Sequence, residues 1–302
     1  MLPSGFHFFE RGWLSSNTLL LQSADQAAVI DTGYATHAEQ LLRLVRQQLQ
    51  GQSLDLLINT HLHSDHCGGN ALLQSHFDQL AVHVPASQFS TVNIWDPQFL
   101  TFELTGQTCE RFKASQSVFN DQFLTICGLD WLAMASPGHD NDSFMLYQPD
   151  HEVLLSADAL WENGFGVVFP EFLGGDGFQG IASTLDDIEK RHVKCVLPGH
   201  GRAFTDVNQA LSLARSKLDY FSKQPDKHAL YAAKVLLKFK LMELHQQELG
   251  TFLAWARSAP LLHTIHGHFF SQTKMAPWVK ALITEMVERK AMRIESGLLI
   301  NL

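Results

Sequence analysis

The chain has 302 residues, of which 45% are hydrophobic and 18% charged, and its formal net charge is −9. These proportions exclude a disordered chain, and no uninterrupted apolar stretch is long enough to span a membrane. The sequence does not begin with a basic region followed by an apolar one, so we expect no signal peptide. Four cysteines without paired spacing favour free thiols and predict a cytoplasmic protein.

The first part of the chain predicts strands that alternate with helices. Short β-rich runs cover residues 17–22 and 27–30, and an apolar stripe at helical spacing predicts a helix over 36–50. The run 54–59 is largely apolar and too short for a helix, which favours a buried strand. The glycine-rich segment 68–70 then opens a further helix.

The same alternation continues to residue 204. Further strands and one helix are predicted by short apolar runs and by apolar residues at helical spacing. The strands cover 123–135, 143–147, 153–155 and 193–197, and the helix covers 181–191. This order of elements predicts a layered α/β fold.

The last third of the chain changes to helices. Helical segments are predicted over 207–221, 229–249 and 251–256, and another begins near Pro277. Apolar runs on both sides of Ser296-Gly297 predict a terminal hairpin. Helices followed by such a ribbon resemble a winged-helix module. We therefore predict two domains, a catalytic one over 1–204 and a mainly helical, winged-helix-like one over 205–302.

Seven residues carry the predicted chemistry, and each lies just past the end of a predicted strand. They are His61, His63, Asp65, His66, His139, Asp158 and His200. Loops at strand ends, held by a rigid sheet, are where catalytic groups usually lie. Imidazole nitrogens and carboxylate oxygens suit zinc and similar cations. A His-x-His-x-Asp-His string after an apolar strand is a strong signal, whereas a single Pro-Gly-His is a weak one.

The spacing of these residues predicts two adjacent metal sites. His61 and His63 can turn toward one ion, and Asp65 and His66 toward a second. The remaining histidines would complete one site each, His139 the first and His200 the second, and Asp158 can bridge because a carboxylate has two oxygens. Three histidines on one ion leave a coordination position open for water, which is typical of a catalytic site.

The chain resembles the metallo-β-lactamase superfamily over roughly residues 15–204. The resemblance rests on 60–69, on Pro-Gly-His at 137–139, on Ser-Ala-Asp at 156–158 and on Pro-Gly-His-Gly at 198–201. It implies an αββα sandwich with a dinuclear site at one edge of the two sheets, and the same assignment of the seven ligands. An Asp at position 158, where the best-known zinc β-lactamases have Cys, resembles the glyoxalase II, lactonase and ribonuclease branches. Asp140 stands where the family often has Thr or Ser.

We therefore expect a metal-dependent hydrolase in which water activated by two divalent ions attacks an ester, thioester or lactone. Asp65 would orient that water and take up its proton. Zinc is the expected metal, with iron and manganese as alternatives. A small molecule is the expected substrate. The aromatic residues Trp161, Phe165 and Phe169, which follow Asp158, are candidates for an apolar substrate pocket, and ordinary packing is the equal alternative.

Three other functions stay open. Residues 205–302 carry 13 basic and 8 acidic residues, whereas 1–204 carry 9 and 23, so a basic C-terminal part could hold RNA for an endoribonuclease or other phosphodiesterase. The chain could instead resemble the mononuclear iron persulfide dioxygenases of the same fold. It could also be a regulatory binding protein with weak hydrolysis. The oligomeric state is not predicted.

Overall fold

The computed structural model describes residues 2–96 and 99–302. Its contacts divide the chain into two compact units: unit 1 comprises Met1–Thr101 and Thr108–Asp219, and unit 2 comprises Phe102–Gln107 and Tyr220–Leu302. This division differs from the sequence boundary at 204/205 because most of helix α7 (Val207–Lys223) belongs to unit 1. No helix in the described ranges is both long and apolar enough to cross a membrane.

Unit 1 contains a six-stranded sheet in the order β1-β2-β3-β4-β5-β6. Its strands are β1 (Phe6–Phe9), β2 (Thr18–Gln22), β3 (Ala27–Ile30), β4 (Leu56–Ile58), β5 (Ala81–Pro85) and β6 (Gln116–Val118). The first three strands are antiparallel, and the strands from β3 to β6 are parallel. Parallel neighbours need crossover connections. Helix α1 (Ala38–Leu49) lies in the connection from β3 to β4, and α3 (Asn70–His76) in that from β4 to β5.

The second sheet of unit 1 has five strands in the order β11-β10-β9-β8-β7. They are β7 (Phe123–Ile126), β8 (Leu129–Ala135), β9 (Phe144–Gln148), β10 (Val153–Ala157) and β11 (Cys195–Pro198). The prediction of one strand over 123–135 is wrong. Cys127 (φ 51°) and Gly128 (φ 78°) are left-handed and turn the chain into the hairpin β7–β8.

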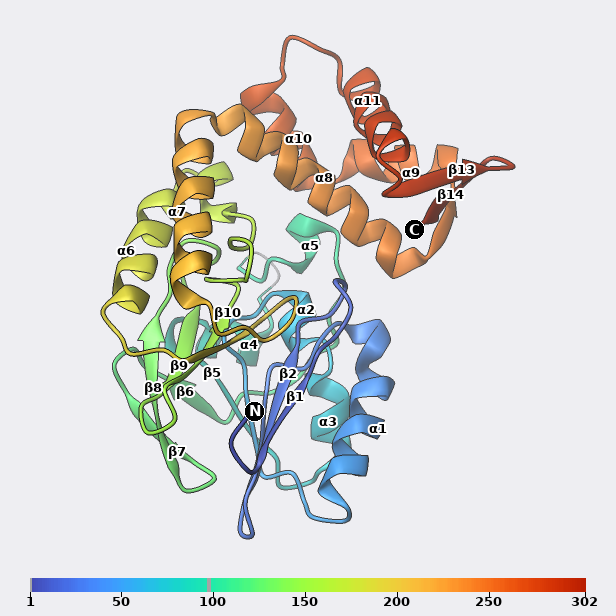
Figure 1. The fold of residues 1–302 in the computed structure, drawn as a ribbon. Coiled ribbons are helices and arrows are strands. Elements are labelled where there is room, and N and C mark those ends of the chain that lie inside the picture. The colour runs from blue at the N-terminus through green and yellow to red at the C-terminus, as the bar shows by residue number, and fades with distance from the viewer. Residues whose placement is uncertain (1, 97–98) are drawn as a thin grey trace. The chain divides into compact units, whose positions relative to one another are not determined.

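The two sheets pack face to face around one hydrophobic core. Inner residues Leu21 and Ile58 of the first sheet join Trp131 and Phe144 of the second in a buried cluster. Residues that alternate with the inner ones along a strand point to the outer face of the sheet, and some of these, such as Leu57, are also fully buried. Figure 1 shows α1 and α3 on one side of the two sheets and α6 (Gly177–Glu189) on the other. Strands buried on both faces read as continuous apolar runs. The predicted α/β sandwich is confirmed.

The shortest helical segments lie in unit 1, except α5, which belongs to unit 2. They are α2 (Ser64–Cys67), α4 (Phe89–Ile94) and α5 (Phe102–Thr105), with single 3₁₀ turns at Ala35–His37, Ala86–Gln88 and Phe169–Phe172. The one-turn helix α2 follows β4 and carries Asp65 and His66, the last two ligands of the predicted metal-binding string.

Unit 2 contains four further helices and a small sheet. The helices are α8 (Pro225–Leu244), α9 (Leu249–Ser258), α10 (Pro260–Phe269) and α11 (Met275–Glu288). Strands β12 (Gln246–Glu248), β13 (Met292–Glu295) and β14 (Leu298–Asn301) pair in the order β12-β14-β13. The expected terminal hairpin is present, with left-handed backbone at Ser296 and Gly297. Helix α10 was not expected from the sequence, and a winged-helix identity for this unit stays a prediction.

Candidate metal centre

The seven residues predicted as metal ligands come together in one cluster of unit 1. Four follow β4, and one each follows β8, β10 and β11, so both sheets contribute through loops at their ends. Every one of the seven is at most 8% exposed. They form overlapping groups whose ligand atoms lie within 4.8 Å of one another: His61-His63-His139, His61-His66-Asp158 and Asp65-His66-His200. We call the first of these groups the first triad and the last the second triad.

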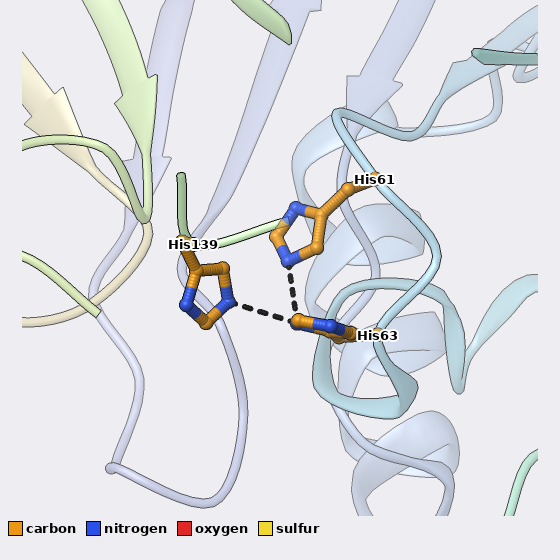
Figure 2. Close-up of side chains that lie close together, drawn as sticks. All are labelled: His61, His63 and His139. Atoms are coloured by element: carbon orange, nitrogen blue, oxygen red, sulfur yellow. Dashed lines mark hydrogen bonds between the residues drawn. The ribbon is translucent and has the colours of Figure 1, made fainter. Parts of the chain in front are cut away.

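The first triad converges on a single point (Figure 2). His61 Nε2 lies 3.1 Å from His63 Nδ1, which lies 2.8 Å from His139 Nε2. Burial lowers the pKa of His63 and of His139 to about 4 and the pKa of His61 well below its ordinary value. Neutral rings present lone pairs, and three lone pairs directed at one point repel one another. A cation between them removes that conflict, so the donor set fits a metal ion.

The second triad lies beside the first and includes a carboxylate. His200 Nε2 lies 3.1 Å from Asp65 Oδ2, and His66 Nε2 lies 4.0 Å from the same oxygen. His66 Nε2 is buried and makes no hydrogen bond within the described part of the chain. A buried polar atom without a hydrogen bond is costly. A second metal ion, held by these three side chains, would satisfy it.

Asp158 faces both triads. Its Oδ2 lies 3.2 Å from His139 Nε2, and its Oδ1 lies 3.4 Å from His66 Nε2 and 3.8 Å from His200 Nε2. Burial alone would raise the pKa of Asp158, but the surrounding imidazoles His200, His66 and His139 lower it well below the usual range. The residue therefore offers one ionised oxygen to each triad, which is the arrangement that a bridging ligand needs.

The outward nitrogens of the histidines are hydrogen-bonded to the protein. His61 Nδ1 lies 3.1 Å from Thr60 Oγ1, and His139 Nδ1 lies 2.6 Å from the carbonyl oxygen of Val167. His63 Nε2 lies 3.3 Å from a carboxylate oxygen of Asp140. Such partners fix the orientation of ligating histidines and select which nitrogen faces the metal. Burial raises the pKa of Asp140 to about 6.

Of the three predicted pocket aromatics, two lie beside the triads and one does not. Phe169 packs edge-on against His63, with ring centroids 5.3 Å apart, and lines a hollow of about 200 Å³ with His139, Asp140 and Leu173. Trp161 donates its Nε1–H to Asp158 Oδ1 over 3.3 Å. Phe165 is fully buried, which favours the packing alternative, and its contact with substrate stays a prediction.

Comparison with known proteins assigns the family. Residues 11–200 match the model of the metallo-beta-lactamase superfamily. The chain belongs to the metallo-β-lactamase superfamily. It is a metal-dependent hydrolase of that superfamily, as the sequence predicted.

Curated relatives of this hydrolase include two kinds of thioester-cleaving enzyme. It is 27% identical over 238 residues to the acyl-coenzyme A thioesterase MBLAC2 of Bos taurus. This alignment covers 72% of this chain and 82% of the relative. It is 29% identical over 200 residues to a hydroxyacylglutathione hydrolase of Xanthomonas campestris pv. campestris (strain B100), which covers 64% of this chain and 63% of the relative.

Solved structures of the superfamily share the fold. The BLEG-1 B3 metallo-beta-lactamase aligns with a TM-score of 0.55 and 24% identity, over 68% of this chain and 96% of that one. A metallo-beta-lactamase family protein from Thermus thermophilus aligns with a TM-score of 0.60 and 17% identity over all of both chains. At these identities the likeness shows the fold alone.

Two residues of this hydrolase beside the triads were missed by sequence reasoning. Asp31 accepts hydrogen bonds from the backbone N–H and the Oγ1–H of Thr60 and lies 2.7 Å from His66 Nδ1. Trp13 stacks on His200, with ring centroids 5.5 Å apart and planes 4° from parallel. Asp31 directly follows a predicted strand, as the seven do, and that position was the available signal. Trp13 has no comparable signal.

A glycine keeps the space that Asp158 occupies. A Cβ on Gly199 would lie 2.3 Å from Asp158 Oδ1 and 2.9 Å from the backbone carbon of Ala157. We expect Gly199→Ala to displace the carboxylate, to lower the free energy of unfolding by about 1–3 kcal/mol, and to lower the metal content. Elemental analysis and thermal melts measure both effects. Gly12→Ala is the matched control, since nothing lies within 4 Å of its Cβ, and equal metal content in both variants would contradict the expectation.

Proposed function

We propose that this hydrolase cleaves thioesters of small molecules with the help of two divalent metal ions. Zinc is the proposed metal. The main support is that two kinds of relative are named for the hydrolysis of thioesters. The acyl-coenzyme A thioesterase matches 72% of the chain and the hydroxyacylglutathione hydrolase 64%. The cluster supports it, because two adjacent three-ligand groups with Asp158 between them suit a dinuclear centre. Four free thiols support a cytoplasmic location.

The cluster divides the work of such a reaction. A pair of divalent cations supplies a strong nucleophile from water near neutral pH and polarises the carbonyl that is attacked. The first triad would hold one ion and the second triad the other, with Asp158 shared. Asp65 Oδ2 is the carboxylate oxygen of the second triad, 3.1 Å from His200 Nε2, and that oxygen would orient the attacking water and accept its proton.

The hollow beside the first triad would receive the acyl part of the substrate. Phe169, Pro170 and the exposed Leu173 form its apolar side, and His63 and His139 form its inner end. Apolar walls with a few convergent polar groups are typical of small-molecule sites. An acyl chain against Phe169 would place its carbonyl carbon next to the first triad.

A substrate panel tests the proposal. Zinc-loaded protein is assayed with acyl-coenzyme A, hydroxyacylglutathione, an oxygen ester, a lactone and single-stranded RNA, and thiol release is followed for the thioesters. We expect kcat/KM of about 10⁴ M⁻¹ s⁻¹ or more for a thioester and far less for the others. His61→Ala protein, which lacks a residue of the first triad, is the blank. Cleavage of RNA with no thioester turnover would favour the phosphodiesterase alternative instead.

As the pH falls, metal should be released from the second triad before the first. Burial lowers the pKa of His66, but Asp31 and Asp158 outweigh that effect and raise its pKa well above the ordinary value. The pKa of His63 and of His139 is about 4. Protons therefore compete with metal for His66 at a higher pH than for the first triad. As the pH falls from 8 to 5, we expect one zinc to be lost well before the other.

Equilibrium dialysis at stepped pH, followed by elemental analysis, measures the metal content. Two variants show which triad loses its metal. His200→Ala disrupts the second triad and so reports on the first, whereas His139→Ala disrupts the first and reports on the second. We expect His139→Ala protein to lose its metal at the higher pH. Simultaneous loss of both ions from the wild-type protein is the outcome that contradicts this order.

A further inference from the structure

Two thiols of unit 1 lie in contact beside the metal centre. The Sγ atoms of Cys67 and Cys109 are 3.7 Å apart, although the residues are separated by 42 positions in the chain. Both cysteines are free, and neither is used by the hydrolytic chemistry. A disulfide has an S–S distance of about 2.05 Å, so the sulfurs need to approach by about 1.7 Å. We propose that Cys67 and Cys109 form a reversible disulfide that fastens the metal-binding turn.

The Cys67 side of this pair is fixed in place. Cys67 ends helix α2 and directly follows His66. The next residue, Gly68, donates its backbone N–H to the carbonyl oxygen of Gly33 over 2.8 Å, and a Cβ there would lie 2.3 Å from the backbone nitrogen of Ala35. Because the turn is pressed this closely against its neighbour, Cys67 cannot shift far.

The Cys109 side lies in irregular structure. Cys109 lies in the segment between α5 and β6, where residues 107–115 form neither helix nor strand. It is partly exposed, whereas Cys67 is fully buried. An oxidant from solvent therefore reaches Cys109 first, and the movement of about 1.7 Å falls on the irregular segment.

Hydrogen peroxide is a sufficient oxidant for the step. The thiol of Cys109 attacks one peroxide oxygen, the O–O bond breaks, and the products are a sulfenic acid and one water. The sulfur of Cys67 then attacks the sulfenic sulfur, an S–S bond forms, and the S–O bond breaks. The released hydroxide takes the proton of the Cys67 thiol and leaves as a second water. Two thiols are oxidised and one peroxide is reduced.

Closure would restrain the turn that carries part of the second triad. The disulfide closes a loop of 42 residues and lowers the conformational entropy of the unfolded chain. It also ties the end of α2 to a second segment. Since Asp65 and His66 lie on α2, unwinding of this helix is one route for metal to leave, and the bond opposes it. The oxidised protein should melt higher and lose metal more slowly.

Peroxide treatment of the zinc-loaded full chain tests the proposal. We expect a mass decrease of about 2 Da, a Cys67–Cys109 cross-linked peptide, and reversal by dithiothreitol. The melting temperature should rise by about 5 °C, and zinc should pass more slowly to a chromophoric chelator.

Two variants sharpen the test. Cys109→Ser should show none of these changes, whereas Cys127→Ser, which removes a half-buried thiol elsewhere in unit 1, should behave like the wild type. Oxidation of Cys109 to sulfinic acid without a cross-link would overturn the proposal. A cross-linked protein that is no more stable than the reduced one would overturn it as well.

Discussion

Asp65→Asn should reduce thioester turnover by about 10³-fold while leaving the fold intact. The substitution keeps the size of the side chain but removes its negative charge, which faces His200 Nε2 over 3.1 Å. An amide oxygen is a weak base, so the attacking water would lose the group that orients it and accepts its proton. We expect the loss to fall on kcat rather than on KM, because the role of Asp65 lies in the chemical step.

The control for this variant is Asp130→Asn. It removes an exposed carboxylate that accepts a hydrogen bond from Thr125 and lies outside the cluster of candidate ligands. Circular dichroism and thermal melts establish that both variants are folded, and elemental analysis shows how much metal each retains. Full activity of the Asp65 variant at wild-type metal content would reject the assigned role. A loss of activity explained wholly by lost metal would make Asp65 a ligand only.

Chelation should abolish activity altogether and destabilise unit 1. The ligands belong to loops of both sheets, so metal binding is coupled to the folded arrangement of those loops. A ligand present at about 100 times its Kd stabilises the folded state by about 2.7 kcal/mol, and two ions would do so in turn. We therefore expect the melting temperature to fall by about 5 °C or more after chelation. Thermal melts and thiol-release assays before and after dialysis measure both losses.

Return of metal distinguishes the alternatives. Activity restored by two equivalents of zinc supports the dinuclear hydrolase. Activity that returns with one iron and no second ion would favour the oxygenase alternative. Protein that regains its stability but no turnover would point to the regulatory alternative.

Much of the fold follows from local sequence patterns. The apolar runs of β3, β4 and β11 are bounded by polar or glycine residues, so their positions could be predicted within about two residues. The hairpin β7–β8 could not, because its turn uses Cys127, a residue that rarely adopts a left-handed backbone. Helix α10 begins at Pro260 directly after α9, and the sequence gives little separation between the two.

The seven candidate ligands could be predicted because each follows a strand within a short polar motif. Their partners depend on tertiary structure. Asp31 and His66 are 35 residues apart and meet only because β3 and β4 are neighbours in the sheet. Trp13 meets His200 where the backbone N–H of Asn17 donates to the carbonyl oxygen of Gly199, which joins segments far apart in the chain. The spacing of residues along the chain does not predict such contacts.

The order of the ligands along the chain also bears on how the protein is made. The residues of the first triad are complete once residue 139 has been synthesised and Asp158 follows, but those of the second triad wait for residue 200. If the proposed pair of ions binds here, a nascent chain would take up at most one ion during most of its synthesis. In the proposed dinuclear centre, the second ion would enter only when β11 has joined the second sheet, so a complete metal pair would mark a fully assembled sandwich.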